Sequence, residues 1–332
     1  MLMLRYFLKR LIWVIPVMLG VLVVVFSITY FTPGDPVLYR LGSSEYTQER
    51  YDEVQKEMGL DKPFLEQLGR YALNLVTKFE MGKSLATNLS VTSEIVVRFP
   101  ITLKLGLLSV FITLIIGLPL GILSAIKQYS AIDTSLTGLA LILAAIPNYV
   151  LALLLIIVFG VNLKWLPITG LGTIGSWIMP ITANSLAGIA VVTRMTRTTM
   201  LEIIRQDFIR TARAKGQKER IVLQRHALKN CLIPIVTSVS GSVAHVMAGS
   251  IIVETIFAIP GMGLFLLSGI TSRDYAVING CVILLSFIIC IINLIVDIVY
   301  ALIDPRIKAQ YASRKKKNKA MQESMPEDAE VA

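Results

Sequence analysis

Long apolar runs constrain this chain most, because about 20 consecutive apolar residues are enough to cross a bilayer as a helix. Of its 332 residues, 55% are hydrophobic and 16% are charged, whereas soluble domains usually contain about 25% charged residues. The sequence therefore predicts an all-α, polytopic membrane protein with six transmembrane helices. The run at 178–193 is short and polar for a span, and we expect its neighbours to shield it. The six predicted spans are 11–31, 105–126, 137–161, 178–193, 232–256 and 278–303.

The first apolar run could also belong to a signal peptide. It is long for that role, and residues 32–36, which follow it, read TPGDP and offer no small-residue cleavage site. We interpret 11–31 as a retained first span.

Charge distribution predicts which loops share a side of the membrane. The segment 194–230 carries ten Lys and Arg against three acids, and the N-terminus and the stretch after 303 are also basic. With six spans these three places share one side, and cytoplasmic loops are the ones enriched in Lys and Arg. We therefore predict a cytoplasmic N-terminus with the first span (1–31), an extracytoplasmic helical subdomain (32–100), a five-helix core with a cytoplasmic loop (101–308) and a disordered cytoplasmic tail (309–332).

Local signals predict two helices in the extracytoplasmic subdomain. The first runs from Thr47 to Met58 and ends at Gly59, because glycine readily adopts the left-handed conformation that closes a helix. The second is amphipathic, and its apolar positions are Leu65, Leu68, Leu75 and Phe79.

The basic segment 194–230 looks like two amphipathic helical halves joined at Gly216, a residue that can turn the backbone. Such an element is either a solvated loop or a surface that a cytoplasmic partner binds. The positions predicted to share a face are Leu201, Ile204 and Phe208 in the first half, and Ile221 and Leu228 in the second.

No catalytic or metal-binding constellation is visible. The sequence holds only two histidines, without HExxH or GxSxG, and its three cysteines form no CxxC pair. Gly82-Lys83-Ser84 resembles the end of a phosphate-binding loop, but Thr77 stands where the first glycine is required. We predict a non-catalytic subunit with no metal site and no cofactor of its own.

The fifth predicted span is unusual because small and polar residues line one stripe of it. An ionisable side chain at membrane depth usually faces a bundle interior or a wet cavity, so we predict that this stripe lines a translocation pathway. The alternative is that the small residues only let helices pack closely, with a neutral histidine hydrogen-bonded to a neighbour. Glu254, near the end of this span, is expected to be solvated or to cap a helix. The stripe consists of Ser238, Gly241, Ser242, His245 and Gly249.

Several sequence pieces, in order along the chain, resemble the membrane permease subunits of the dipeptide/oligopeptide/nickel class of ATP-binding-cassette importers. Together they make a specific signal over most of the chain. They are TPGDP (32–36), GLDKP (59–63), RFPITL (98–103), RTARAKG (210–216), RHALKN (225–230), Glu254 with Phe257, Pro260, Gly261 and Gly263, Arg273 with Asp274, and DPR (304–306).

The resemblance implies a coupling helix in the loop at 194–230 that docks into a groove on an ATPase subunit. In such permeases this loop carries a motif of the form EAA-x3-G-x9-I-x-L-P, whose glycine falls here on Gly216. Arg210 and Lys229 replace its Glu and Pro, a departure that resembles the first-permease type of the peptide class. The implied ATPase-coupling residues are Thr211, Ala212, Lys215, Gly216, Arg220, His226 and Leu228.

The same resemblance implies the function and the partners. The chain would be a permease subunit in the inner or plasma membrane of a prokaryote, importing short peptides by alternating access. Its partners would be a second permease, two cytoplasmic ATPases that bind ATP and magnesium, and an extracytoplasmic binding protein. Nucleic acid is not expected as a partner, because the basic charge lies in short loops between spans.

Three alternatives remain at this stage. The first has nickel or a metal chelate as the substrate, since the subunits look alike and selection lies largely in the binding protein. A secondary transporter is disfavoured because paired intramembrane carboxylates are lacking. An intramembrane enzyme is disfavoured because no nucleophile and base lie on facing spans.

Overall fold

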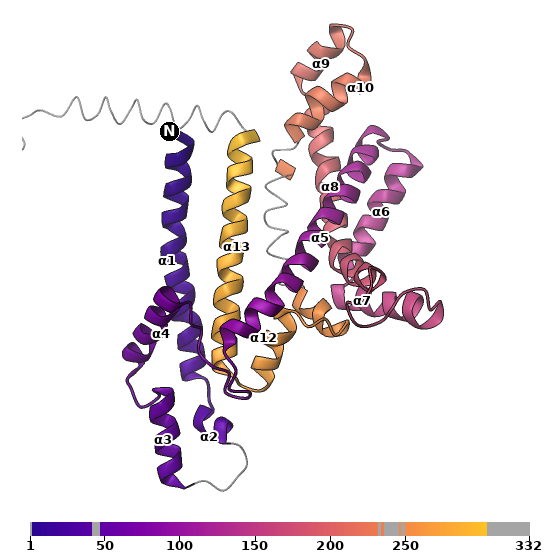
Figure 1. Ribbon diagram of the computed structural model, residues 1–332. Coiled ribbons are helices and arrows are strands. Elements are labelled where there is room, and N and C mark those ends of the chain that lie inside the picture. The colour runs from indigo at the N-terminus through magenta and orange to yellow at the C-terminus, as the bar shows by residue number, and fades with distance from the viewer. Residues whose placement is uncertain (1, 42–46, 232–233, 236–245, 247–249, 304–332) are drawn as a thin grey trace, which may run out of the picture.

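The computed structural model describes residues 2–41, 47–231, 234–235, 246 and 250–303, and this part of the chain is helical, without a strand (Figure 1). The predicted all-α polytopic fold is confirmed. Four single helices are long and apolar enough to cross a membrane. They are α1 (Leu2–Phe31), α5 (Val91–Ile126), α8 (Gly175–Ile204) and α13 (Tyr275–Ile303).

The predicted third span is not one continuous helix. Helix α6 (Ala131–Ala145) is followed by α7 (Asn148–Leu155), which continues as the π-helix η1 (Ile156–Asn162), and the two parts are bent by 102°. The bend falls before Pro147, where Ile146 has ψ 124°, because a proline disfavours the helical conformation of the residue before it. The pair is either one broken span or a re-entrant segment.

The predicted fifth span, 232–256, falls mostly outside the described residues. Its last part, 250–256, is helical. The count of six spans therefore stays a prediction, as does the disordered tail at 309–332, which also lies outside the described residues.

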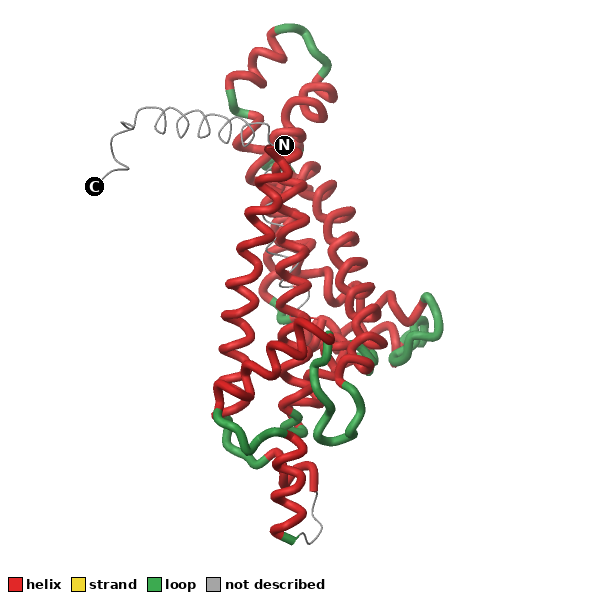
Figure 2. Tube along the Cα trace, turned by 60° about the vertical axis from the view of Figure 1, so that its left-hand side comes forward, coloured by secondary structure: helices red, strands yellow, loops and turns green. Residues whose placement is uncertain are grey.

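Different segments lie at the two ends of the bundle, as Figures 1 and 2 show. The start of α1, the end of α13 and the basic loop after α8 lie at one end. The short helices α2 (Pro36–Leu41) and α3 (Gln48–Met58) lie at the other end. The structure thus separates the basic loop from α2 and α3 along the bundle axis.

Helices α5 and α8 pack closely because small residues face each other. A Cβ on Gly117 would lie 2.9 Å from Cβ of Val192, and one on Gly121 would lie 2.5 Å from Cβ of Thr196. In a membrane such close approach replaces the hydrophobic effect as the source of helix–helix affinity. Helix α5 begins at Val91, well before the predicted start at Leu105.

Both helices predicted in the region 32–100 are present, but the apolar set predicted for the second is only partly right, because Leu65 is exposed and Phe79 lies just after the helix. Helix α3 begins after Thr47, whose side chain accepts a hydrogen bond from the Arg50 amide, and ends at Gly59 with φ 69°. Helix α4 (Phe64–Lys78) follows after a short turn. The ends of α3 are fixed by capping groups close together in sequence, so sequence alone locates them.

Candidate functional site

The first part of the basic segment, 194–204, belongs to α8, and the sequence pattern does not reveal the break that follows. Helix α8 ends at Ile204 and α9 (Asp207–Ala214) begins three residues later, so Leu201 and Phe208 belong to different helices. The predicted shared face is therefore wrong. Phe208 is exposed, whereas its neighbour Ile209 is fully buried.

The predicted turn at Gly216 is confirmed. Gly216 has φ 74° and its amide donates to the Arg213 carbonyl at 2.9 Å, a left-handed conformation that suits glycine. The chain then enters α10 (Glu219–Ile221) and the π-helix η2 (Val222–Leu228).

The second half of the loop buries a different face from the predicted one. Ile221 is exposed and Leu228 only partly buried, while Val222 and Ala227 are fully buried. The i, i+7 spacing assumes an α-helix, whereas the π-helical turn changes which residues align.

A buried cluster attaches the loop to the spans. Apolar side chains from α9 and η2 pack against the C-terminal part of α5 and the last turns of α8. The loop is therefore a packed part of the protein and not a solvated connection. The buried members of this cluster are Ala125, Met200, Ile209, Ala212, Val222, Ala227, Cys231 and Ile235.

The structure divides the seven predicted coupling residues into two groups. Thr211, Lys215, Gly216 and Arg220 lie on the exposed outer side of the loop. Ala212 belongs to the buried cluster, and the side chains of His226 and Leu228 are partly buried. Only the first group offers its full surface to a partner.

Two polar contacts that the sequence analysis missed hold the halves of the loop together. Arg213 donates to Glu219 through Nε at 3.1 Å and Nη2 at 2.6 Å. The hydrogen bond from Arg213 lowers the pKa of Glu219, and the pKa of Arg213 is raised in return. His226 Nε2 lies 2.8 Å from Gln217 Oε1.

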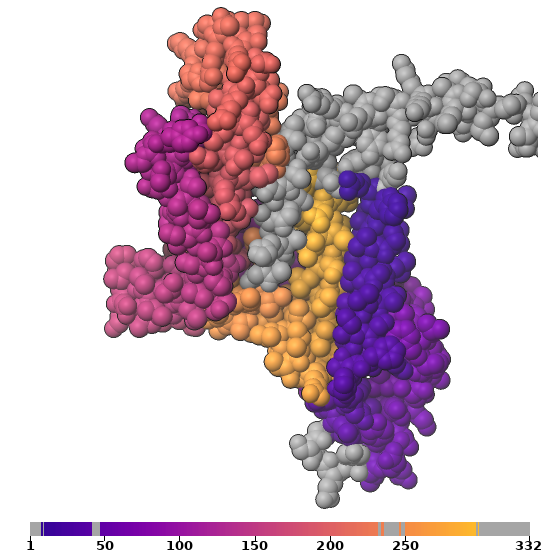
Figure 3. Space-filling model, turned by 180° about the vertical axis from the view of Figure 1, so that it is seen from behind, coloured from indigo at the N-terminus to yellow at the C-terminus, as the bar shows by residue number. Residues whose placement is uncertain are grey.

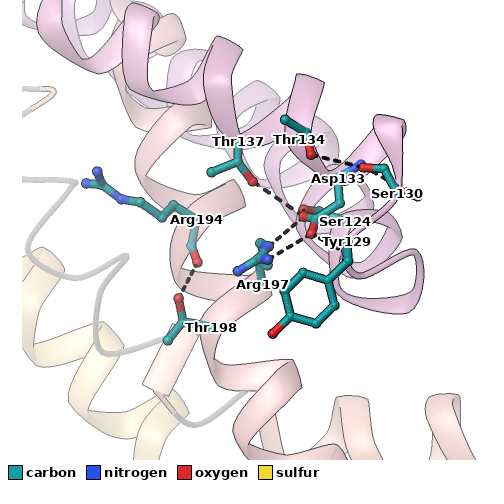
Figure 4. A network of polar contacts seen from close by, with 9 residues as sticks. All are labelled: Ser124, Tyr129, Ser130, Asp133, Thr134, Thr137, Arg194, Arg197 and Thr198. Atoms are coloured by element: carbon teal, nitrogen blue, oxygen red, sulfur yellow. Dashed lines mark hydrogen bonds and ion pairs between the residues drawn. The ribbon is translucent and has the colours of Figure 1, made fainter.

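A buried ion pair lies at the base of the loop (Figure 4). Arg197 of α8 donates to both carboxylate oxygens of Asp133, at 2.6 and 2.8 Å. Asp133 also accepts from the Ser124 hydroxyl at 2.5 Å and from the Tyr129 amide at 2.9 Å. The pair thus ties α8, the end of α5 and the start of α6 together.

A second buried carboxylate lies toward the opposite end of the bundle. Glu254 is fully buried and accepts from the Thr102 hydroxyl at 2.6 Å and from the amides of Gly263 and Leu264 at 2.7 and 3.0 Å. These amides are in the first turn of α12 (Met262–Thr271), so Glu254 caps that helix. The capping expectation is confirmed, and the solvated one is wrong.

The packing around Glu254 leaves no room for a side chain at Gly261 or Gly263. A Cβ on Gly261 would lie 2.5 Å from the Glu254 carboxylate, and one on Gly263 would lie 2.6 Å from the Ile251 Cα. The pieces RFPITL and Glu254–Gly263, far apart in sequence, therefore form one structural unit.

A third carboxylate, Asp274, joins the region 32–100 to the start of α13. It accepts from the Ser84 hydroxyl at 2.6 Å and from the amides of Ala86 and Val277 at 3.3 and 3.2 Å. The Ser84 hydroxyl thus has a structural role as the partner of Asp274.

The predicted pathway residues Ser238, Gly241, Ser242, His245 and Gly249 lie outside the described residues. Within the described part of the chain, no group of three or more His, Cys, Asp or Glu side chains is placed to hold a metal ion.

Comparison with known proteins identifies the family. Residues 117–309 match the model of the binding-protein-dependent transport system inner membrane component, and residues 3–106 match the corresponding N-terminal model. A Brucella abortus (strain 2308) protein, named as a peptide transport system permease, is 38% identical over 310 residues, covering 91% of this chain and 98% of its own. The dipeptide transport system permease protein DppB of Escherichia coli (strain K12) is 33% identical over 337 residues, covering 92% and 99%.

A solved structure shares the fold. An inward-facing form of the MetNI methionine ABC transporter matches with a TM-score of 0.55 and 20% identity, over 63% of this chain and 96% of that chain. The family match spans more than half of the sequence and the relatives cover nearly all of it. This chain therefore belongs to the family of inner membrane components of binding-protein-dependent transport systems.

Proposed function

We propose that this chain is one of two permease subunits that together form the pathway of an ATP-driven peptide importer. Two relatives that match over at least 91% of the chain are named for peptide or dipeptide transport. An extracytoplasmic binding protein delivers the peptide. Two separate ATPase subunits bind ATP and magnesium, and this chain contributes no catalytic group.

The packing of the basic loop is the observation that carries the coupling role. Ile209 and Val222 of the loop are fully buried against the ends of α5 and α8. A force applied to its exposed side, where Lys215 and Arg220 lie, is passed directly to two spans. Because packed interfaces are bistable, such a push can switch the bundle between outward and inward openings.

The same arrangement supports an orientation in the membrane. The basic loop and the start of α1 lie at one end of the bundle, and we assign that end to the cytoplasm by the positive-inside rule. The subdomain that contains α2 and α3 then faces the binding protein. The stripe in 238–249 is the proposed lining of the pathway.

Reconstitution tests the substrate class. The complex, assembled in liposomes with its cognate binding protein, is expected to hydrolyse ATP faster when a di- or tripeptide mixture is added. Nickel ions, or nickel with a histidine chelator, should leave the rate at its basal value. Stimulation by nickel and not by peptides would assign the importer to metal transport.

Proline at Gly216 tests the loop as the transmission element. Proline fixes φ near −65° and lacks an N–H, whereas Gly216 has φ 74° and donates to Arg213. We expect Gly216→Pro to assemble into the complex but to lower peptide-stimulated ATP hydrolysis several-fold.

Lys218→Pro is the matched control in the same turn, because Lys218 already has φ −60°. It should retain stimulation close to that of Lys218→Ala, which accounts for the lost charge. Full stimulation in an assembled Gly216→Pro complex would remove this turn from the transmission path.

A further inference from the structure

Helix α4 has an apolar side that its packing within the chain does not use. No residue of this helix is buried. Its large apolar side chains Leu65, Leu73 and Val76 are 77, 62 and 79% exposed, and Phe79, which follows the last helical residue, is 65% exposed. Leu65 and Val76 lie eleven residues, or about three turns, apart, so they share one side of the helix. Such a set of exposed apolar groups marks a binding surface for lipid or protein.

The side of α4 that faces the protein is a different one. Phe64 packs on Phe26, Tyr30 and Phe31 of α1, with ring centroids 5.0 to 5.9 Å apart. Leu75 packs against the buried cluster that includes Cys281 of α13. These contacts fix α4 to the outer part of α1 and leave its apolar side pointing outward.

Charged residues occupy the remaining side of α4. Glu66 and Arg70 form an i, i+4 ion pair with 3.2 Å between Oε1 and Nη2, and Thr77, eleven residues after Glu66, is exposed on the same side. An outward apolar side beside a charged side is the pattern of a helix that lies at a membrane surface.

The exposed side of α4 continues the bilayer-facing surface of α1. Only 6% of the most apolar stretch of α1, within Arg10–Phe31, is buried inside the protein. The exposed side chains of Val24, Ile28 and Phe31 follow one face of this helix. Phe31 stacks on Phe64 at 5.8 Å, next to Leu65. Figure 3 shows α4 beside α1, on the side away from α13.

We propose that α4 is an interfacial helix whose Leu65 and Val76 side, together with Phe79 just after the helix, lies among the acyl chains of the outer leaflet, with Leu73 at the border of the charged side. Phe64 holds it to α1, and the Glu66–Arg70 side faces the headgroups and water. The helix thereby anchors the subdomain with α2 and α3 at a fixed height above the bilayer. Within the region 32–100, α4 thus lies at the membrane interface and not in the aqueous phase.

Spin labels on single cysteines test this placement in the assembled complex in lipid nanodiscs. Leu65→Cys and Val76→Cys probe the apolar side, and Glu66→Cys and Thr77→Cys are the matched controls one residue further on. The background lacks Cys231, Cys281 and Cys290. We expect oxygen, which concentrates in lipid, to relax the first pair more strongly, and a water-soluble nickel chelate to relax the controls more strongly.

Two outcomes would overturn the proposal. Nickel access at all four positions would place α4 in water, and shielding of Leu65 and Val76 from both reagents would place a protein partner on it. A second measurement keeps the native cysteines. A benzophenone side chain at Val76 should crosslink phospholipid, and a crosslink to another subunit or to the binding protein would contradict the proposal.

Discussion

Replacing Glu254 by alanine is expected to cost on the order of 3–5 kcal/mol of unfolding free energy, the largest effect we predict for one side chain. The substitution leaves the Thr102 hydroxyl and the amides of Gly263 and Leu264 without their buried acceptor. Each unsatisfied buried donor costs about 1–3 kcal/mol, and the missing carboxylate also leaves a cavity. Unfolding in mixed micelles, followed by circular dichroism, measures the loss.

Three further variants sharpen this prediction. Glu254→Gln keeps the shape and one acceptor oxygen, so it should lose only about 1–2 kcal/mol. Gly263→Ala should be severe, because its Cβ would lie 2.6 Å from the Ile251 Cα and backbone cannot easily move aside. Thr255→Ala is the matched control, because Thr255 is exposed and its hydroxyl bonds only the Ile251 carbonyl within the same helix. Equal stability of Glu254→Ala and Thr255→Ala would refute the capping role.

Sequence patterns predicted the elements whose signals are local. The ends of α3 follow from Thr47 and Gly59, which act within one turn of the helix. The turn at Gly216 follows likewise from a residue that tolerates positive φ. Pro147 also gives a local signal for the bend between α6 and α7, but the apolar residues on both sides of Pro147 and Asn148 favour a continuous span.

Contacts between distant residues could not be read from the sequence. The resemblance singled out the RFPITL piece and Glu254, but nothing in a single sequence shows that Thr102 meets a carboxylate 152 positions away. The break after Ile204 is hidden for a related reason. Burial of Ile209 against the ends of α5 and α8 outweighs the helical periodicity that continues to Phe208.

Breaking the contact between Asp133 and Arg197 is expected to cause the second large loss of unfolding free energy that we predict. Asp133 is 3% exposed, and Arg197 contacts both of its oxygens. Removing one partner of a buried pair leaves an uncompensated charge, which typically costs about 3–5 kcal/mol. Because 23% of the Arg197 side chain is exposed, we expect Arg197→Met to fall at the lower end of that range. Arg197→Lys should recover only part of the loss, because Lys lacks the planar fork that binds two oxygens at once.

Arg194→Met is the matched control, because Arg194 lies on the same helix with its side chain exposed and directed away from Asp133 (Figure 4). It should change the unfolding free energy by less than about 0.5 kcal/mol. A double-mutant cycle with Asp133→Asn isolates the pair, and we expect a coupling of about 1–3 kcal/mol between the two sites. If the two losses simply add, the pair does not hold α8 to the turn between α5 and α6. The basic loop would then be joined to the spans through its buried apolar cluster alone.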